Sequence, residues 1–71
     1  METRLTEREK SVLILLVKGF KNDDIANELN VSVHTVKAHL EAIYEKLEVV
    51  NRVQAVVRAL QLGLIEVDDI Q

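Results

Sequence analysis

The 71-residue chain has no cysteine and no proline, and it has only two glycines, one phenylalanine, one tyrosine and no tryptophan. The absence of cysteine excludes disulfide bridges and zinc sites built on thiolates. The scarcity of proline, glycine and aromatic residues favours helices over strands. The longest apolar run, residues 12–17, is far shorter than the roughly 20 residues of a membrane-spanning helix. We therefore expect one small all-α domain in the cytoplasm, without a membrane partner.

Negative charge is distributed unevenly along the chain. The net charge of −3, taken alone, argues against a nucleic-acid partner. Residues 22–31 carry three acids and no base, and residues 48–71 carry four acids and two arginines, whereas residues 1–21 have an excess of positive charge. The acids are thus concentrated in two short segments, and the net charge does not by itself exclude DNA.

Local signals place two helices in the first part of the chain. Thr6 and Glu9 have the spacing of a capping box and Gly19 follows the apolar run, which predicts a helix over about residues 7–18. Asn22 is a suitable N-cap for a short second helix that ends near residue 29. Asn30 then suits a turn, because asparagine tolerates the left-handed conformation.

Two further helices follow. Ser32 can cap a helix over about residues 33–47. Its apolar residues recur at steps of three and four and form one stripe: Val33, Val36, Leu40, Ile43 and Leu47. Asn51 can cap a fourth helix that ends before Gly63, after which residues 64 and 65 fold back. We expect the acidic tail over residues 67–71 to be frayed.

The second and third helices, joined by the turn at Asn30, form a helix-turn-helix over about residues 22–41. Opposite the apolar stripe, the third helix carries small and polar residues: His34, Ala38, Glu41, Ala42 and Glu45, flanked by Thr35 and Lys37. Ala38 would let the helix approach base edges, and Lys37 could donate to guanine or to phosphate. Ser32 and Thr35 could bond phosphates. The same pattern also fits a solvated helix face.

Several motifs occur together in an order typical of one family. They are LTERE over residues 5–9, the LL…G of the first helix, IA at 25 and 26, TVKAH over 35–39, KL at 46 and 47, NR at 51 and 52, and GLI over 63–65. From residue 5 to residue 65 the chain resembles the LuxR-type (NarL/GerE-type) helix-turn-helix DNA-binding domain. Such domains form the C-terminal effector domain of bacterial two-component response regulators.

The resemblance implies one domain over residues 1–71, with a three-helix core and a fourth, dimerisation helix over about residues 52–62. It implies sequence-specific binding of double-stranded DNA in bacterial transcription regulation, with the third helix in the major groove. A homodimer would occupy paired half-sites, either only on DNA or in the full-length protein. RNA polymerase is a further candidate partner. We expect no cofactor, no metal ion and no enzymatic activity.

The resemblance also assigns contacts residue by residue. The predicted base contacts are His34, Lys37, Ala38 and Glu41. The predicted DNA-backbone contacts are Lys21, Ser32, Thr35, Tyr44, Lys46 and Arg52. Three positions depart from the family pattern: Lys21 replaces a frequent serine and adds a cation, Ala42 replaces a frequent asparagine, and Glu48 stands where glycine is common. We expect Glu48 to give the link after the third helix a different backbone geometry.

The apolar residues of the fourth helix lie on two faces, which is typical of a helix with two surfaces to cover. Ala55, Ala59 and Leu62 share the face that we expect to pack on the core. Val53, Val57 and Leu60 share the other face and form the predicted dimer interface. The alternative is that the core of this small domain covers both faces.

Two other functions stay open at this point. A sigma-factor region that recognises a promoter element uses a similar helix-turn-helix, although the NR and GLI motifs argue against it. An acidic helical protein-protein adapter is favoured by the net charge and by Glu41 and Glu45. The positions of four cationic residues would separate DNA binding from the adapter: Lys21, Lys37, Lys46 and Arg52. If they cluster around the start of the third helix, DNA is favoured, and if they are scattered, the adapter is favoured.

Metal binding and catalysis have little support in the sequence. His34 and His39 are about 140° apart around a helix, so they do not converge on a metal ion. No Ser/His/Asp or Cys/His arrangement and no glycine-rich phosphate loop is identifiable.

Overall fold

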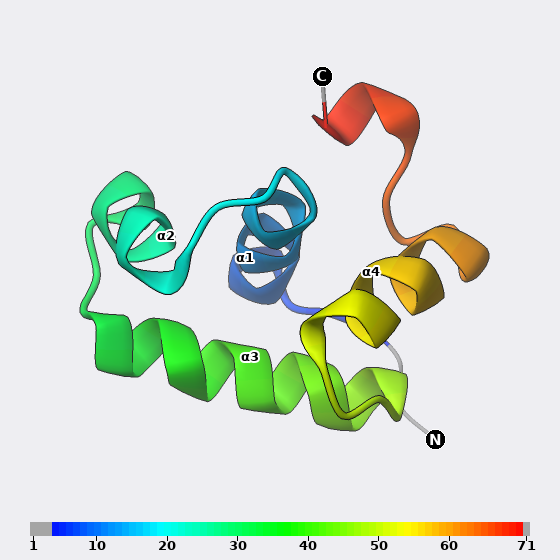
Figure 1. The fold of residues 1–71 in the computed structure, drawn as a ribbon, viewed down its shortest axis with the longest axis horizontal. Coiled ribbons are helices and arrows are strands. Elements are labelled where there is room, and N and C mark those ends of the chain that lie inside the picture. Colours follow the sequence, from blue (N-terminus) through cyan, green and yellow to red (C-terminus); the bar gives the residue numbers. More distant parts are fainter. Residues whose placement is uncertain (1–3, 71) are drawn as a thin grey trace.

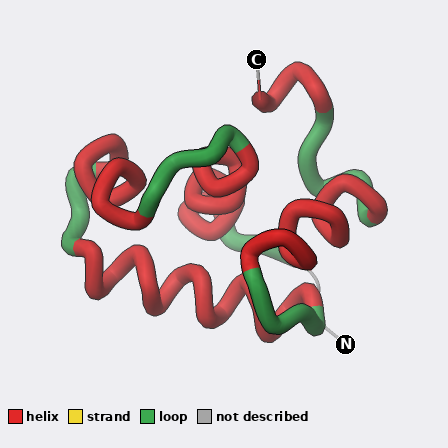
Figure 2. The backbone as a smooth tube through the Cα atoms, in the orientation of Figure 1, coloured by secondary structure: helices red, strands yellow, loops and turns green. Residues whose placement is uncertain are grey.

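The computed structural model describes residues 4–70, and most of these residues lie in helices. The elements are α1 (Glu7–Val17), α2 (Asn22–Leu29), α3 (Val33–Leu47), α4 (Arg52–Gln61) and the short 3-10 helix η1 (Val67–Ile70). In Figure 1, α3 runs along one side of the domain, with α2 over its beginning, α4 over its end and α1 between them. Residues 4–70 contain no strand (Figure 2), and none of their helices is long and apolar enough to cross a membrane. The predicted all-α fold is confirmed.

The core takes apolar side chains from all four α-helices. Its members are Val12, Leu13, Leu15, Leu16, Ile25, Ala26, Val36, Leu40, Ile43, Leu47, Ala55, Ala59 and Ile65. The predicted stripe on α3 is buried apart from Val33, which is half-buried. Burial of a side chain such as Ile43 stabilises the fold by roughly 1.5 to 3 kcal/mol. The stripe therefore holds α3 against the domain and leaves its opposite side exposed.

Most of the predicted helix ends are confirmed. Thr6 and Glu9 form the capping box of α1, with hydrogen bonds of 3.0 and 3.1 Å in the two directions. Asn51 accepts from the Gln54 amide at 2.9 Å and caps α4. Asn30 has a φ of 58°, the predicted left-handed conformation.

The start of α2 differs from the prediction. Lys21, not Asn22, occupies the N-cap position, because its extended backbone lets its carbonyl accept from the Ile25 amide at 2.9 Å. Asn22 is the first helical residue. An ammonium group cannot accept a hydrogen bond, so the side chain at this N-cap leaves the first amides of α2 uncapped.

The expectation of a different backbone geometry at Glu48 is wrong. Glu48 has a φ of 58°, so it adopts the left-handed conformation that glycine reaches without strain. For a residue with a Cβ atom this conformation costs roughly 1 to 2 kcal/mol. The link between α3 and α4 thus keeps a glycine-like turn at some cost in stability.

The C-terminal part departs from the prediction in two ways. Leu62 lies at the C-cap of α4 and is 47% exposed rather than packed in the core, because the helix ends at Gln61 and the chain turns at Gly63. Ile65 fills the core instead and is only 2% exposed. Residues 67–70 form η1 and are not frayed, since Asp69 accepts from the Glu66 amide at 2.9 Å and η1 contacts α1. Gln71 lies outside the described residues.

Candidate nucleic-acid interface

The exposed side of α3 carries the four predicted base contacts. His34, Lys37, Ala38 and Glu41 are all exposed, and together they are called the recognition surface below. Figure 1 shows α1, α2 and α4 gathered along one side of α3, and the buried residues of the α3 stripe pack into the core that these helices share. An uncovered helix of this kind fits the major groove of B-DNA, which is about 12 Å wide. The fold thus leaves the recognition surface open to a duplex.

The start of α3 presents two hydroxyl groups. Ser32 accepts from the Thr35 amide at 3.0 Å, and the two side-chain oxygens lie 2.9 Å apart. Only one hydroxyl proton is needed between these two oxygens, so the other proton can be donated to a third group. The pair caps the helix and still has a donor for a phosphate oxygen.

Arg52, one of the predicted DNA-backbone contacts, reaches the segment just before α2, which contains Lys21, another of these contacts. The Arg52 guanidinium at the beginning of α4 donates to the backbone carbonyl of Phe20, the residue before Lys21. The Lys21 side chain is exposed, whereas Arg52 is half-buried. The Arg52 guanidinium therefore lies close to the backbone just before α2, whose first turn also carries Asp23 and Asp24. Arg52 also fixes α4 to the turn between α1 and α2.

Lys46 has internal partners. Its ammonium donates to a carboxylate oxygen of Glu9 at 2.6 Å and to the backbone carbonyl of Arg4 at 3.2 Å. These contacts join the last turn of α3 to the start of α1. The sequence gives no signal for this pair, because the two residues are 37 positions apart. Lys46 thus serves the fold, and it does not belong to the expected cation cluster around the start of α3, because it lies in the last turn of that helix.

The pKa of Glu9 reflects a balance between burial and its partners. Burial alone would raise the pKa of this carboxyl group, because it disfavours the charged form. The hydrogen bond from Lys46, the hydrogen bonds from Thr6 and the positive charge of Lys46 outweigh that effect and lower the pKa below its ordinary value of 4.5. The carboxylate is therefore the form that the fold stabilises.

Glu9→Gln is expected to make the domain less stable at neutral pH and less sensitive to acid. A carboxyl group whose pKa is lowered on folding stabilises the fold above its unfolded pKa, and this contribution is lost as the pH falls through the lower, folded pKa. Replacing a charge-assisted hydrogen bond by a neutral one should reduce the free energy of unfolding by roughly 1 to 2 kcal/mol at pH 7. Thermal unfolding between pH 7 and pH 2 measures both effects.

Glu45→Gln is the matched control for this test, since Glu45 is an exposed glutamate on α3 with no ion pair among residues 4–70. Its unfolding curves should follow those of the parent chain. An equal loss of stability in Glu9→Gln at pH 7 and at pH 2 would contradict the role assigned to the Glu9 carboxylate.

Tyr44 is half-buried and packs against the core from the far half of α3. His34 is exposed and His39 is half-buried. Residues 4–70 hold no group of three or more potential ligand side chains placed to bind a metal ion.

The predicted dimer interface is exposed. Val53, Val57 and Leu60 are 72%, 48% and 47% exposed, whereas Ala55 and Ala59 on the opposite side of α4 are fully buried. The alternative that the core covers both faces of α4 is therefore wrong for the described residues. These three side chains are called the apolar patch below. Large exposed apolar residues that cluster on one helix face are typical of interaction surfaces.

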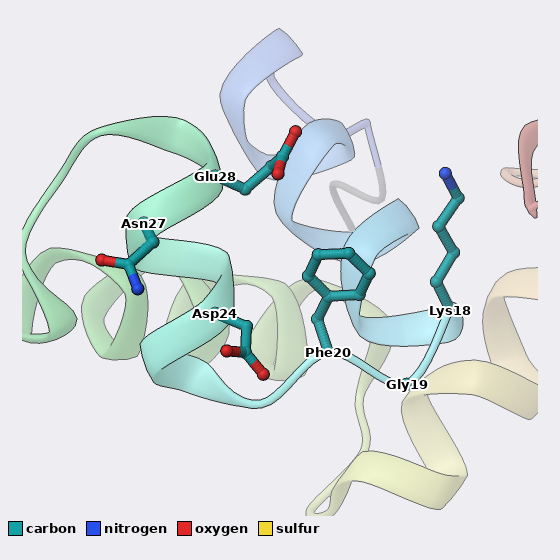
Figure 3. A pocket seen from close by; sticks show the side chains of 6 residues that line it. All are labelled: Lys18, Gly19, Phe20, Asp24, Asn27 and Glu28. Carbon is teal, nitrogen blue, oxygen red and sulfur yellow. The ribbon is translucent and has the colours of Figure 1, made fainter.

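A hollow of about 540 Å³ lies between the end of α1 and α2 (Figure 3). Phe20 forms part of its wall, and the carboxylates of Asp24 and Glu28 and the ammonium of Lys18 line it. Two carboxylates against one ammonium make this hollow unfavourable for a polyanion. The acidic surface of the domain thus lies partly on α2, away from the recognition surface.

Comparison with known proteins relates this chain to a family by its sequence. The family model described as bacterial regulatory proteins, luxR family, matches residues 3–59, which include the whole helix-turn-helix. Over 62 residues the chain is 47% identical to the response regulator protein VraR of Staphylococcus aureus, and equally to VraR of Staphylococcus saprophyticus and of Staphylococcus epidermidis.

Each of these alignments covers 87% of this chain but 30% of the relative, so the chain spans less than a third of the length of these response regulators. The family model covers well over half of the chain, and the four helices have the order that the sequence motifs predict. The chain belongs to the luxR family of bacterial regulatory proteins.

Proposed function

We propose that this chain is the DNA-binding effector domain of a bacterial response regulator and that it binds double-stranded DNA as a homodimer, with α3 in the major groove. The recognition surface carries this proposal, because it is exposed on a helix whose other side is anchored by buried apolar residues. Membership of the luxR family and the likeness to longer response regulators support it. The family also favours this function over a sigma-factor region and over the acidic adapter, although Lys46 lies outside the expected cation cluster.

Each residue of the recognition surface has a role in this proposal. Ala38 is small, so the helix can approach the base edges closely, and its methyl group can contact a thymine methyl group. Lys37 donates to guanine O6 or N7, and Glu41 accepts from cytosine N4. His34 lies nearest the start of the helix and can donate to a base edge or to a phosphate.

Phosphate binding is assigned to groups around the starts of α2 and α3. Lys21 and the spare hydroxyl donor of Ser32 and Thr35 are donors suited to phosphate oxygens. The amides at the start of α2 are less suited, because Asp23 and Asp24 lie in the same turn. Arg52, Lys46 and Tyr44 act mainly by holding α3 and α4 in place, since their side chains are half-buried and Arg52 and Lys46 have internal partners.

On each copy, few cationic side chains remain to contact phosphates, because Arg52 and Lys46 have internal partners. One domain alone should therefore bind a half-site with only modest affinity. In a homodimer formed through the apolar patch, binding of the second half-site becomes intramolecular, so the dimer would bind paired half-sites much more tightly than one domain binds one half-site. Binding should weaken as salt rises, with a slope set by the phosphates that each dimer neutralises.

Selection of bound duplexes from a random DNA pool tests this proposal directly. The expected result is one enriched sequence that contains two related half-sites. Failure to enrich any sequence, together with no binding to duplex DNA at low salt, would contradict DNA binding and favour the acidic adapter.

Glu41→Ala is expected to relax specificity without strengthening all binding equally. A carboxylate that accepts from cytosine N4 contributes roughly 1 to 3 kcal/mol of discrimination against other bases, and it repels phosphates. The variant should bind the selected duplex less tightly and tolerate substitution at one cytosine position. Competition binding with a panel of single-substitution duplexes measures this.

Glu45→Ala is the control, since Glu45 is also exposed on α3 but lies one turn further from the helix start. It should keep the base preference of the parent chain. If Glu41→Ala tightened binding to every duplex by the same factor, Glu41 would have no role in reading bases.

A further inference from the structure

Two hollows lie along α1 and α2, on residues that have no role in the proposed DNA contacts. The hollow in Figure 3, of about 540 Å³, lies between the end of α1 and α2. A smaller hollow, of about 220 Å³, lies between the middle of α1 and the end of α2, and its lining residues are Ser11, Ile14, Leu15, Glu28 and Leu29. Glu28 lines both hollows, so they adjoin and are together called the α1–α2 groove below. Within residues 4–70 the lining takes no residue from α3 or α4, so an occupant would not need the recognition surface.

The floor of the α1–α2 groove is partly apolar. The groove follows α1 up to its C-cap, because Ser11, Ile14 and Lys18 recur at steps of three and four and so share one side of the helix over about two turns, or roughly 10 Å. Ile14 and Leu29 are half-buried at one end, Phe20 is half-buried at the other, and all three pack against the core. Apolar side chains that the core holds in place but leaves partly exposed suit the apolar face of a short helix.

The rim of the α1–α2 groove on α2 is acidic. Asp24 and Glu28 lie one turn apart, are exposed, and form no ion pair within residues 4–70. In Figure 3 the Glu28 side chain extends from α2 toward α1. The last turn of α2 has no basic residue, so the negative end of the helix dipole lies near Glu28 without a compensating cation. Lys18, at the other end, is the one cationic side chain that lines the groove in the described part of the chain. The Glu28 end therefore favours a cationic group.

We propose that the α1–α2 groove binds a short amphipathic helical segment of a partner protein, with apolar side chains on Ile14 and Leu29 and a lysine or arginine beside Glu28. Charge complementarity and the apolar floor select this occupant together. The rim repels an acidic segment and the phosphates of a duplex. A purely cationic ligand, such as a polyamine, would leave the apolar floor uncovered. The proposal does not depend on DNA binding.

Selection from a phage-displayed library of random peptides, about three helical turns long, tests this proposal with the whole chain as the target. Peptides that also bind the Glu28→Lys chain are removed before each round. The enriched peptides are expected to carry apolar residues at steps of three and four and more lysine and arginine than acids. One of them is then synthesised with two variants, one with glutamate for its basic residues and one with serine for its apolar residues. Each variant should bind the chain at least about 10-fold more weakly.

Glu28→Lys should weaken binding of the synthesised peptide by roughly 10-fold, because it replaces attraction by repulsion at the rim. The fold should be retained, since Glu28 is exposed in the last turn of α2, where the helix dipole favours a lysine. Glu45→Lys is the matched control, because Glu45 is an exposed glutamate on α3 that lines neither hollow. It should leave the affinity for the peptide unchanged.

Nuclear magnetic resonance locates the bound peptide. The backbone amide signals that shift on binding should be those of the groove, with Ser11, Phe20 and Leu29 among them. Signals of the recognition surface and of the apolar patch should stay in place.

Three results would overturn the proposal. One is that no peptide is enriched, and another is that the serine variant binds as tightly as the selected peptide. The third is that the shifted signals belong to the recognition surface or to the apolar patch. The outcome for DNA is separate. A chain that bound the peptide in the groove but bound no duplex would contradict the proposed function alone, and a chain that bound the selected duplex but enriched no peptide would contradict this proposal alone.

Discussion

Val57→Glu should abolish cooperative binding to paired half-sites and leave binding to a single half-site unchanged. Val57 is exposed on the outer face of α4, so a glutamate there is solvated in the monomer and does not disturb the core. In a homodimer joined through the apolar patch, two glutamates would be buried close together, at a large cost in desolvation and repulsion. Coupling between two binding sites typically changes the affinity of each by about 5-fold to 150-fold. Titration of duplexes with one and with two selected half-sites measures it.

Val67→Glu provides the control, because Val67 is another exposed valine but lies in η1. It should retain cooperative binding, and both variants should unfold near the temperature of the parent chain. Unchanged cooperativity in Val57→Glu would show that the two copies contact each other through another surface.

Lys37→Ala should weaken binding to the selected duplex by roughly 1 to 3 kcal/mol, or about 5-fold to 150-fold, if its ammonium reads a base. Lys37 is exposed on α3, and alanine is a strong helix former, so the fold should be retained. Binding to random duplexes should change much less. Titrations of both kinds of duplex at several salt concentrations separate the two effects.

Lys10→Ala serves as the control, since Lys10 is an exposed lysine on α1 rather than on α3. It should affect the selected and random duplexes little and equally. If Lys37→Ala weakened both kinds of duplex by the same factor and lowered the salt slope by about one, Lys37 would be a phosphate contact rather than a base contact.

Features set by a few neighbouring residues could be predicted from the sequence. The capping box of Thr6 and Glu9, the left-handed Asn30, the cap at Ser32 and the stripe of α3 each depend on short spacings, and all are confirmed. The error at the start of α2 is also local. Asn22 has the better capping side chain, but the carbonyl of Lys21 is the one that accepts the first helical bond.

Features that depend on distant contacts could not be predicted. Nothing in the sequence pairs Lys46 with Glu9 or directs Arg52 to the carbonyl of Phe20, because these contacts exist only after the helices have packed. Leu62 has the right helical angle for the core, but the helix ends before it and Ile65 takes the place in the core. The base contacts are still predictions that rest on the exposed face of α3.

The contact between Lys46 and Glu9 has a consequence for the dynamics of α1. The same oxygen of Glu9 accepts from the Thr6 amide at 3.0 Å and from the Lys46 ammonium at 2.6 Å. Amide protons at the start of a helix usually exchange with solvent through local fraying. Here one carboxylate oxygen joins the first turn of α1 to the last turn of α3. We therefore expect the Thr6 amide to exchange more slowly than it would if Glu9 had no contact with Lys46.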